Sequence, residues 1–403
     1  MKLMSVVGIL ALIAIAYIFS TNRKAIKWRT VLAAFAVQFA FAFLVLYTAW
    51  GRKALEWISN GVQSVLNTAG DGIAFVFGTA VGGDNFVFAF QVLPIIIFMS
   101  SLIALLYYLG VMQWVIRILG TALAKALGTS RKESLSATAN IFVGQTEAPL
   151  VIKPYLPTMT QSELFAVMVG GLASVAGSVL AGYAALGVPL EYLLAASFMA
   201  APAGLLFAKI IVPETEEYDD DIEIVEDEEN RAANFVDAAA RGASDGLFLA
   251  LNVGAMLLAF VSLIALVNLI LGSVGGLFGF DSLSLELILG YVFAPLAFII
   301  GVPWADAVQF GSFLGQKLVL NEFVAFSEFA PIIGTGDLSA RTEAMIAFAL
   351  CGFANISSLA ILLGGLGGMA PNRRGDIARM GVLAILAGTL ANLMSATLAG
   401  LLL

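Results

Sequence analysis

The sequence predicts an all-α integral membrane protein with about eight transmembrane helices and two re-entrant helical hairpins in inverted repeats. Of its 403 residues, 60% are hydrophobic and only 12% are charged. A soluble domain carries about 25% charged residues, so a soluble multidomain protein is excluded. The sequence also contains no His and one Cys. His-based acid–base chemistry, a Ser-His-Asp triad, His metal ligands and an intrachain disulfide are therefore excluded.

Apolar segments long enough to cross a bilayer recur along the whole chain. They occupy about 4–20, 30–49, 88–111, 164–187, 189–212, 247–271, 343–366 and 379–403. The first segment is too long for the apolar region of a signal peptide, and its stronger basic cluster follows it, so we interpret it as a transmembrane helix. Between the second and third segments, 51–69 is expected to form an amphipathic helix at the membrane interface.

The distribution of charge predicts the orientation in the membrane. If the N-terminus is outside, the predicted cytoplasmic loops hold 11 of the 20 Lys and Arg residues, as the positive-inside rule requires. We therefore expect a multi-pass protein of the cell membrane, the bacterial inner membrane, with both termini on the outer face. The acidic pI comes from Glu214–Glu229, which holds 11 of the 28 acidic residues and no base. We interpret this segment as a solvated loop, with calcium binding as the alternative.

Two further segments, 133–162 and about 306–333, are apolar but contain polar residues, and the first is interrupted by Gly144, Pro149, Pro154 and Pro157. Irregular backbone at membrane depth is tolerated only where protein or a water-filled cavity surrounds it. Each segment therefore predicts a re-entrant hairpin. Each hairpin lies between an apolar span and a Gly- and Ser-rich span, and the second set enters from the opposite side. Inverted repeats with interrupted helices indicate a transporter with a binding site near the membrane midplane.

Carboxylates and amides within these segments are candidate ligand-binding groups. Glu147 lies in the first hairpin beside Gln145 and Thr146, and Glu322 lies in the second hairpin. A carboxylate at the bilayer centre costs several kcal/mol, so each must face a cavity or a partner. Pairing of Glu147 with a base such as Lys153 is the alternative.

Asn355 and Ser358 are three residues apart and share one helical face. The sequence is compatible with two roles for this pair, ligand binding and helix packing. Phe353 is either a stacking surface for a ligand or an ordinary core- or lipid-facing residue. Carboxylates, amides and hydroxyls without Arg or Lys suit a small, uncharged, polyhydroxylated solute.

Several motifs resemble those of the concentrative nucleoside transporters in their bacterial, eight-span, sodium-coupled form. The resemblance extends from about residue 30 to the end and is carried by GQTEAPLVIKPYL, NVGAMLLAF, NEFVAF and CGFANISSLAILLGGLGGMAPNRRGDIARMG. It implies a homotrimer that takes up nucleosides, such as uridine, cytidine or adenosine, by sodium symport and an elevator-type movement. It implies no enzyme activity, no cofactor other than the coupling sodium ion, and no nucleic-acid partner.

The same resemblance suggests a division of the chain into a scaffold and a mobile transport domain. The scaffold is expected to comprise 1–111, with the interfacial helix, and the span 247–275. The transport domain is expected to comprise 112–212 and 280–403, each with one hairpin and two spans. An acidic cytoplasmic loop with an interfacial segment, 213–246, connects the halves.

The resemblance also implies roles for individual residues. Those expected to contact the nucleoside are Gln145 and Thr146 at the nucleobase with Glu147 nearby, Glu322, Asn355 and Ser358 at the ribose hydroxyls, and Phe353 and Val179 at its flanks. Those expected to bind sodium are Asn140, the Val143 carbonyl, Ser174 and the Val175 carbonyl. Oxygen-only ligation suits a hard monovalent cation.

Three alternative functions stay open from the sequence. Proton coupling is one, because a carboxylate can also relay protons. A membrane-embedded hydrolase using Glu147 and Glu322 as an acid–base pair is another, although no metal cage or nucleophile motif accompanies them. A passive channel is the third, and accumulation against a gradient would distinguish it. Preference for purines or pyrimidines is also open, and the size of residue 144 is expected to tune it.

Overall fold

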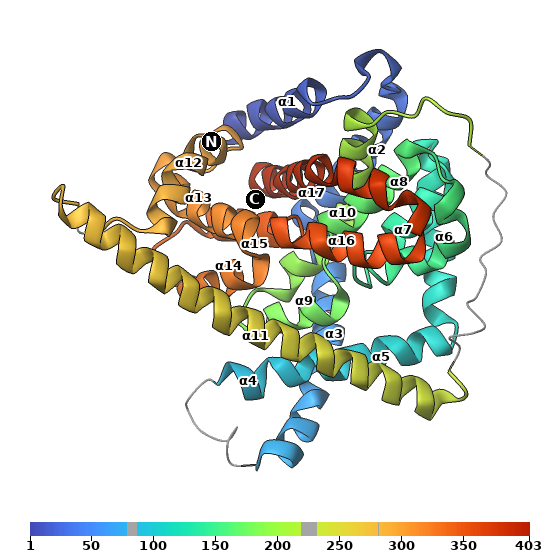
Figure 1. Ribbon diagram of the computed structural model, residues 1–403, viewed down its shortest axis with the longest axis horizontal. Coiled ribbons are helices and arrows are strands. Elements are labelled where there is room, and N and C mark those ends of the chain that lie inside the picture. The colour runs from blue at the N-terminus through green and yellow to red at the C-terminus, as the bar shows by residue number, and fades with distance from the viewer. Residues whose placement is uncertain (79–86, 219–231, 281) are drawn as a thin grey trace.

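The computed structural model describes residues 1–78, 87–218, 232–280 and 282–403, and these form helices joined by short loops with no strand (Figure 1). The helices are α1 (Lys2–Ile18), α2 (Trp28–Ala42), α3 (Ala49–Phe77), α4 (Phe88–Gln91), α5 (Leu93–Tyr108), α6 (Val111–Leu127), α7 (Arg131–Ala139), α8 (Gln161–Ala173), α9 (Gly177–Ala185), α10 (Leu190–Ile211), α11 (Phe235–Gly276), α12 (Leu285–Ile299), α13 (Trp304–Val319), α14 (Glu322–Phe329), α15 (Ala340–Leu350), α16 (Ile356–Met369) and α17 (Arg374–Leu402).

All eight predicted spans fall on helices. Six helical stretches of the described chain are long and apolar enough to cross a bilayer, or seven if the bent pair α12 and α13 is counted as one span. The predicted span 4–20 falls on α1, which at 17 residues is slightly shorter than a full crossing. The predicted span 343–366 is divided between α15 and α16. These two predicted spans explain why six such stretches are found where eight spans were predicted.

Two predicted spans are not continuous helices. The span 164–187 consists of α8 and α9 with a break at 174–176, and the span 343–366 breaks at 351–355. Hydropathy does not register such breaks, because the residues in them are mostly small or apolar. The interfacial helix expected at 51–69 is also longer than predicted, since α3 has 29 residues.

The two predicted hairpins differ in their second arms. In the first, α7 is followed by a 3₁₀ segment, Ala148–Thr158, instead of a second α-helix. Pro154 and Pro157 lie inside this segment, and proline removes the N–H that an α-helix requires. The second hairpin is formed by α13 and α14, as predicted.

Helix α12 lies outside every predicted span. Its 15 residues are apolar but too few to cross a bilayer alone, which is why a search for long apolar segments misses it. It turns by 120° into α13 and packs along it. The turn contains Gly301 at φ +103°, where a side chain is strained and a Cβ would also overlap Ser5.

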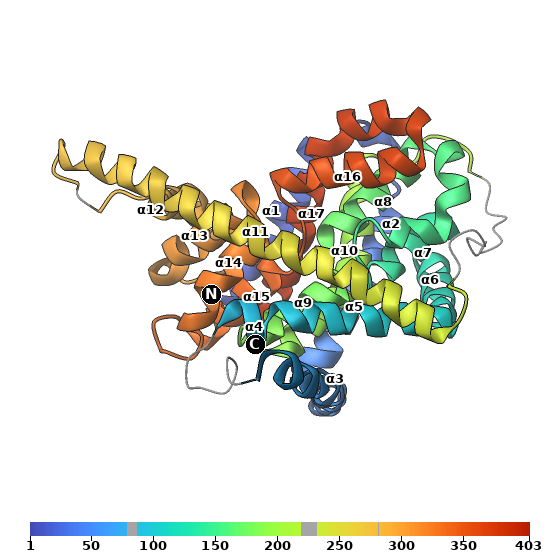
Figure 2. The same cartoon turned by 60° about the horizontal axis from the view of Figure 1, so that its bottom comes forward.

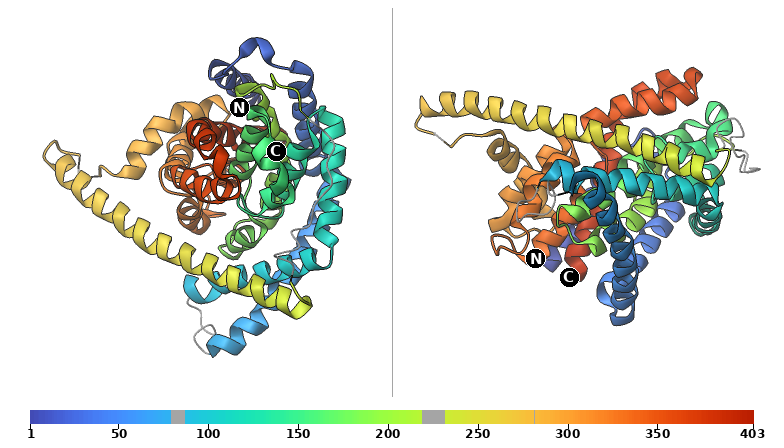
Figure 3. Two further views of the ribbon diagram at one scale, coloured as in Figure 1. Left: turned by 45° about the vertical axis from the view of Figure 1, so that its right-hand side comes forward. Right: turned by 90° about the horizontal axis from the view of Figure 1, so that it is seen from below.

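The helices form a buried centre and an exposed periphery (Figures 2 and 3). The apolar window of Gln161–Ala185 is 94% buried and that of α10 is 89% buried, whereas the window of α11 is only 6% buried. Helix α11 has 42 residues, about 63 Å of helix, and lies alongside α5. An apolar helix exposed in this way fits contact with lipid or with another subunit, while α7, α8 and α15 are almost fully buried.

Candidate functional site

Glu322 is the centre of a buried hydrogen-bond network. It is the first residue of α14 and only 5% exposed. Its Oε1 accepts a hydrogen bond from the Tyr183 hydroxyl at 2.9 Å, and its Oε2 accepts one from Asn355 Nδ2 at 3.0 Å. Segments from α9, α14 and the start of α16 therefore meet at one carboxylate.

Asn355 is fixed by its position as the N-cap of α16. Its Oδ1 accepts hydrogen bonds from the Ser358 N–H at 2.8 Å and from the Ser357 hydroxyl at 2.7 Å. The amide nitrogen is therefore the group that faces Glu322. Because the N-termini of α14 and α16 both meet at Glu322, their partial positive charges stabilise a carboxylate there.

The breaks of the two broken helices lie against each other. The Phe353 N–H donates to the Ser174 carbonyl at 3.1 Å, which joins the second break directly to the first. Asn392, from α17, donates to the Ala173 carbonyl at 2.6 Å and to the Cys351 carbonyl at 3.0 Å. Carbonyls that α8 and α15 leave unpaired at their ends are thus satisfied by one amide.

The tip of the first hairpin makes a separate set of contacts. Gln145 is buried, and its Oε1 has no hydrogen-bond partner among the described residues. Thr146 lies against α16 where Gly365 leaves room, since a Cβ there would be 2.7 Å from the threonine methyl. Glu147 is exposed, and its Oε2 accepts a hydrogen bond from the Gly144 N–H at 2.5 Å.

The structure thus groups only some of the predicted nucleoside-binding residues. Glu322, Asn355 and Ser358 form one contact cluster, with Phe353 half-buried next to it in the chain. Val179 is buried in α9, the helix that also carries Tyr183. Thr146 reaches α16 more than two turns beyond Asn355, and the hydrogen bond described for Glu147 is within its own hairpin. Their roles stay predictions.

The predicted sodium-binding residues lie on two segments that are held together. The Gly177 N–H donates to the Phe142 carbonyl at 3.0 Å, which ties the hairpin tip to the start of α9. Asn140 Nδ2 donates to the Ser136 carbonyl at 2.9 Å, so its Oδ1 points away from α7; this buried oxygen has no partner among the described residues. Ser174 donates to the Gly170 carbonyl and keeps its lone pairs.

This donor set fits a cation. A buried acceptor without a hydrogen-bond donor is unfavourable, and a bound cation would satisfy the Asn140 Oδ1. Val143 and Val175 are buried beside these side chains in non-helical backbone, where carbonyls are available as further oxygen ligands.

Three residues of this region were missed from the sequence, namely Tyr183, Lys317 and Asn392. The candidate set contains no Lys or Arg, but a buried Lys lies near it in the sequence. Lys317, five residues before Glu322, is fully buried, and its Nζ donates to the Ala349 carbonyl and to Asn392 Oδ1. A single Lys in an apolar hairpin was the available signal, because intramembrane charges are usually functional.

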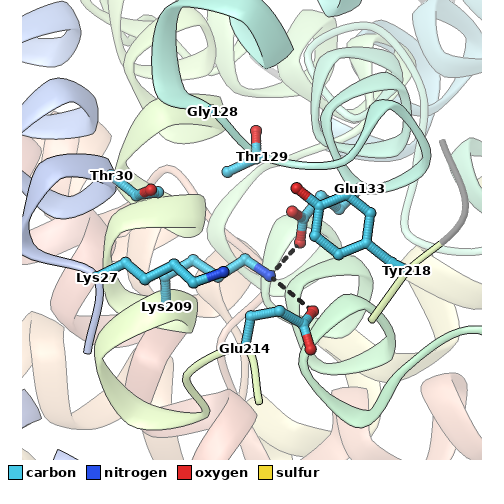
Figure 4. Close-up of a pocket in the computed structure, with 8 residues that line it drawn as sticks. All are labelled: Lys27, Thr30, Gly128, Thr129, Glu133, Lys209, Glu214 and Tyr218. Carbon is cyan, nitrogen blue, oxygen red and sulfur yellow. Dashed lines mark ion pairs between the residues drawn. The ribbon is translucent and has the colours of Figure 1, made fainter. Parts of the chain in front are cut away.

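A pocket elsewhere in the molecule is lined by other residues (Figure 4). They are Lys27, Thr30, Gly128, Thr129, Glu133, Lys209, Glu214 and Tyr218. Lys209 Nζ lies 2.6 Å from Glu133 Oε2 and 3.8 Å from Glu214 Oε2. Glu214 is buried, so the expectation of a solvated loop is wrong at its first residue. Residues 219–229 of the acidic segment lie outside the described residues.

Comparisons with known proteins identify the family. The model described as "Na+ dependent nucleoside transporter C-terminus" matches residues 192–400, and its N-terminal counterpart matches residues 7–80. A third model, described as "Nucleoside recognition", matches residues 89–190. Together these matches extend over most of the chain.

Similar proteins are found in distant organisms. An uncharacterized transporter of Bacillus subtilis, YutK, is 58% identical with 99% of both chains covered. The nucleoside permease NupC of Helicobacter pylori is 52% identical with 99% of this chain and 97% of the permease covered. Human solute carrier family 28 member 3 is 42% identical, and the chain spans 60% of its length.

Solved structures show the same fold. CNTnw in an inward-facing, substrate-bound state has a TM-score of 0.95 and 55% identity, with 99% of this chain and 98% of CNTnw covered. A CNTnw variant in an outward-facing state has a TM-score of 0.97 and 56% identity, with 100% and 98% covered. These matches confirm the predicted membrane-protein fold and family. The chain therefore belongs to the family of sodium-dependent, concentrative nucleoside transporters and is a multi-pass membrane transporter, not an enzyme.

Proposed function

We propose that this protein imports nucleosides, such as uridine, cytidine or adenosine, across the bacterial inner membrane by sodium symport. The observation that carries the proposal is the hydrogen bond between the Phe353 N–H and the Ser174 carbonyl. It joins the segment that leads to Asn355 and Glu322 with the segment that leads to the candidate ion ligands. An ion that orders one break can therefore order the other.

The nucleoside is proposed to bind between the first hairpin and the network around Glu322. The carboxylate of Glu322 accepts hydrogen bonds from ribose hydroxyls, with Asn355 and Ser358 beside it. The unpaired Gln145 Oε1 is suited to accept an N–H of the nucleobase, since a buried acceptor gains from a donor. Thr146 and Glu147 complete the nucleobase end, and Val179 and Phe353 flank the ligand.

Sodium is proposed to bind at Asn140, Ser174 and the carbonyls of Val143 and Val175. The unpaired Asn140 Oδ1 supports this assignment. In this position the ion would be coordinated by oxygen atoms of both the hairpin tip and the first break, and would hold these two segments together. Nucleoside binding next to this tip would then depend on sodium.

An elevator-type movement of the transport domain, 112–212 and 280–403, against a scaffold of 1–111 and 247–275 is proposed to carry both ligands. CNTnw has been solved in inward-facing, intermediate and outward-facing states, which supports alternating access. The exposed apolar surface of α11 supports a scaffold role and a homotrimer. Both termini are proposed to lie on the outer face.

The test is equilibrium binding of uridine and adenosine to the purified protein while sodium replaces choline at constant ionic strength. Each ligand should raise the affinity of the other by the same factor, because binding linkage is reciprocal. Equal nucleoside affinity with and without sodium would contradict sodium coupling.

Uptake by proteoliposomes completes the test of the mechanism. A sodium gradient should drive nucleoside accumulation above the outside concentration, which a passive channel cannot do. Accumulation driven by a pH gradient in the absence of sodium would support proton coupling instead.

A further inference from the structure

Lys317 and the candidate sodium ligand Asn140 lie at matching places in the two repeats. Asn140 follows the last residue of α7 and lies beside Gly170 in the last turn of α8, just before the break at 174–176. Lys317 is in the last turn of α13 and reaches the last turn of α15, just before the break at 351–355. In both repeats the hairpin helix packs against the broken helix that follows it.

The Lys317 amine is held by oxygen atoms of the same kinds as those proposed for sodium. Its Nζ donates to the Ala349 carbonyl at 2.7 Å and to Asn392 Oδ1 at 2.7 Å. The Asn392 side chain is oriented by donating to Ala173 and Cys351, so its oxygen must face the amine. A cation at the C-terminal end of a half-helix is also stabilised by the helix dipole.

We propose that the Lys317 side chain supplies the second repeat with a cation that is part of the protein. Its ammonium group occupies, at the α15–α16 break, the place that sodium occupies at the α8–α9 break in the first repeat. This inference rests on the proposed function, because the sodium site is its template. Lys317 is a positioning residue that acts through Asn392 and the break.

The proposal has a consequence for coupling. A side chain that supplies the cation makes the second break independent of ions in solution. Only the first repeat then needs an ion to become ordered. If the side chain is removed, the oxygen atoms that held it should become a site for a cation from solution.

The experiment measures uridine binding to Lys317→Ala over a range of sodium concentrations. Uridine should bind at least about tenfold more weakly at the sodium concentration that saturates the wild type, because the Ala349 carbonyl and the Asn392 oxygen lose their charged donor. Binding should require one more sodium ion per nucleoside than in the wild type. Ammonium, methylammonium or ethylammonium should restore the affinity.

Lys209→Ala is the matched control. Lys209 is also buried, with its amine 2.6 Å from Glu133 Oε2 and 2.9 Å from the Ser162 hydroxyl. Its removal should add no sodium ion to uridine binding, and amines should not change the affinity. Wild-type binding by Lys317→Ala, or weak binding that neither sodium nor amines improve, would overturn the proposal.

A second variant keeps the proposal testable if Lys317→Ala does not fold. Lys317→Gln has a similar length and still donates to a carbonyl, but it has no charge and leaves no space for an amine. It should bind uridine more weakly than the wild type without rescue, and unchanged affinity would overturn the proposal. The wild type in the same series tests the proposed function, because uridine binding that does not depend on sodium refutes that function. If wild-type binding depends on sodium but the Lys317 variants bind uridine as the wild type does, only this inference is refuted.

Discussion

The substitution Glu322→Gln is the most direct test of the proposed ribose site. Glu322 is buried and accepts two hydrogen bonds, from Tyr183 at 2.9 Å and from Asn355 at 3.0 Å. The Asn355 side chain cannot turn over, because its oxygen is held by the Ser358 N–H and the Ser357 hydroxyl. The oxygen of the introduced glutamine must therefore face Asn355, and its amide nitrogen must face Tyr183.

The network can accept this change with little loss of stability. The Tyr183 hydroxyl can rotate and accept a hydrogen bond instead of donating one. What disappears is the charge of the acceptor. A hydrogen bond to a charged group contributes about 1.5–3 kcal/mol and one between neutral groups about 0.5–1.5 kcal/mol. For one or two ribose hydroxyls the loss is about 1–3 kcal/mol, which corresponds to about 5- to 150-fold weaker nucleoside binding.

Calorimetric binding of uridine in saturating sodium measures this effect, and size-exclusion chromatography checks that the oligomer is intact. Glu328→Gln is the matched control, because Glu328 lies on the same short helix but is exposed. It should bind uridine as the wild type does. If Glu322→Gln also binds uridine within about twofold of the wild type, a range too small for the loss of a charged acceptor, the ribose assignment is refuted.

Three further substitutions, one of them with a matched control, test the rest of the site. Asn140→Ala removes the unpaired buried oxygen, so the sodium concentration for half-maximal uridine binding should rise about tenfold; an unchanged sodium titration would place the ion elsewhere. Tyr183→Phe leaves Glu322 Oε1 without a donor and should cost about 1–3 kcal/mol of stability, measured as a lower Tm of the solubilised protein; an unchanged Tm would contradict the network. Gly352→Ala places a Cβ inside the Asn392 side chain and should lower the Tm strongly, whereas Gly364→Ala, whose Cβ would meet nothing within 4 Å, should not.

The sequence predicted the fold where a single segment carries its own signal. Each predicted span lies on one helix or on two helices separated by a short break, because burial in lipid or in a protein core selects apolar residues in either case. The breaks at 174–176 and 351–355 escaped prediction because their small and apolar residues are compatible with a helix. The backbone can leave the helical conformation at these breaks because partners elsewhere in the chain, such as Asn392, donate hydrogen bonds to the freed carbonyls.

The same limit applies to the site. Glu147 and Glu322 were noticed because a carboxylate in an apolar segment is conspicuous, and the family motifs supplied Asn140 and Ser174. Tyr183 and Asn392 are ordinary residues of apolar helices, and their importance lies in partners far away in sequence. The bond between Tyr183 and Glu322 joins residues 139 positions apart, which no local pattern can indicate.

The hydrogen bond between the two breaks explains how a sodium ion could affect the binding of a nucleoside that it does not contact. If sodium fixes Ser174, the Ser174 carbonyl fixes the Phe353 N–H. Phe353 precedes by two residues Asn355, whose side chain holds Glu322. On the proposed assignments the ion would need no contact with the nucleoside, because the contacts that order its own site would also order the proposed ribose acceptors. Reciprocity then follows, since a nucleoside that fixes Glu322 and Asn355 must in turn favour the ordered form of the first break.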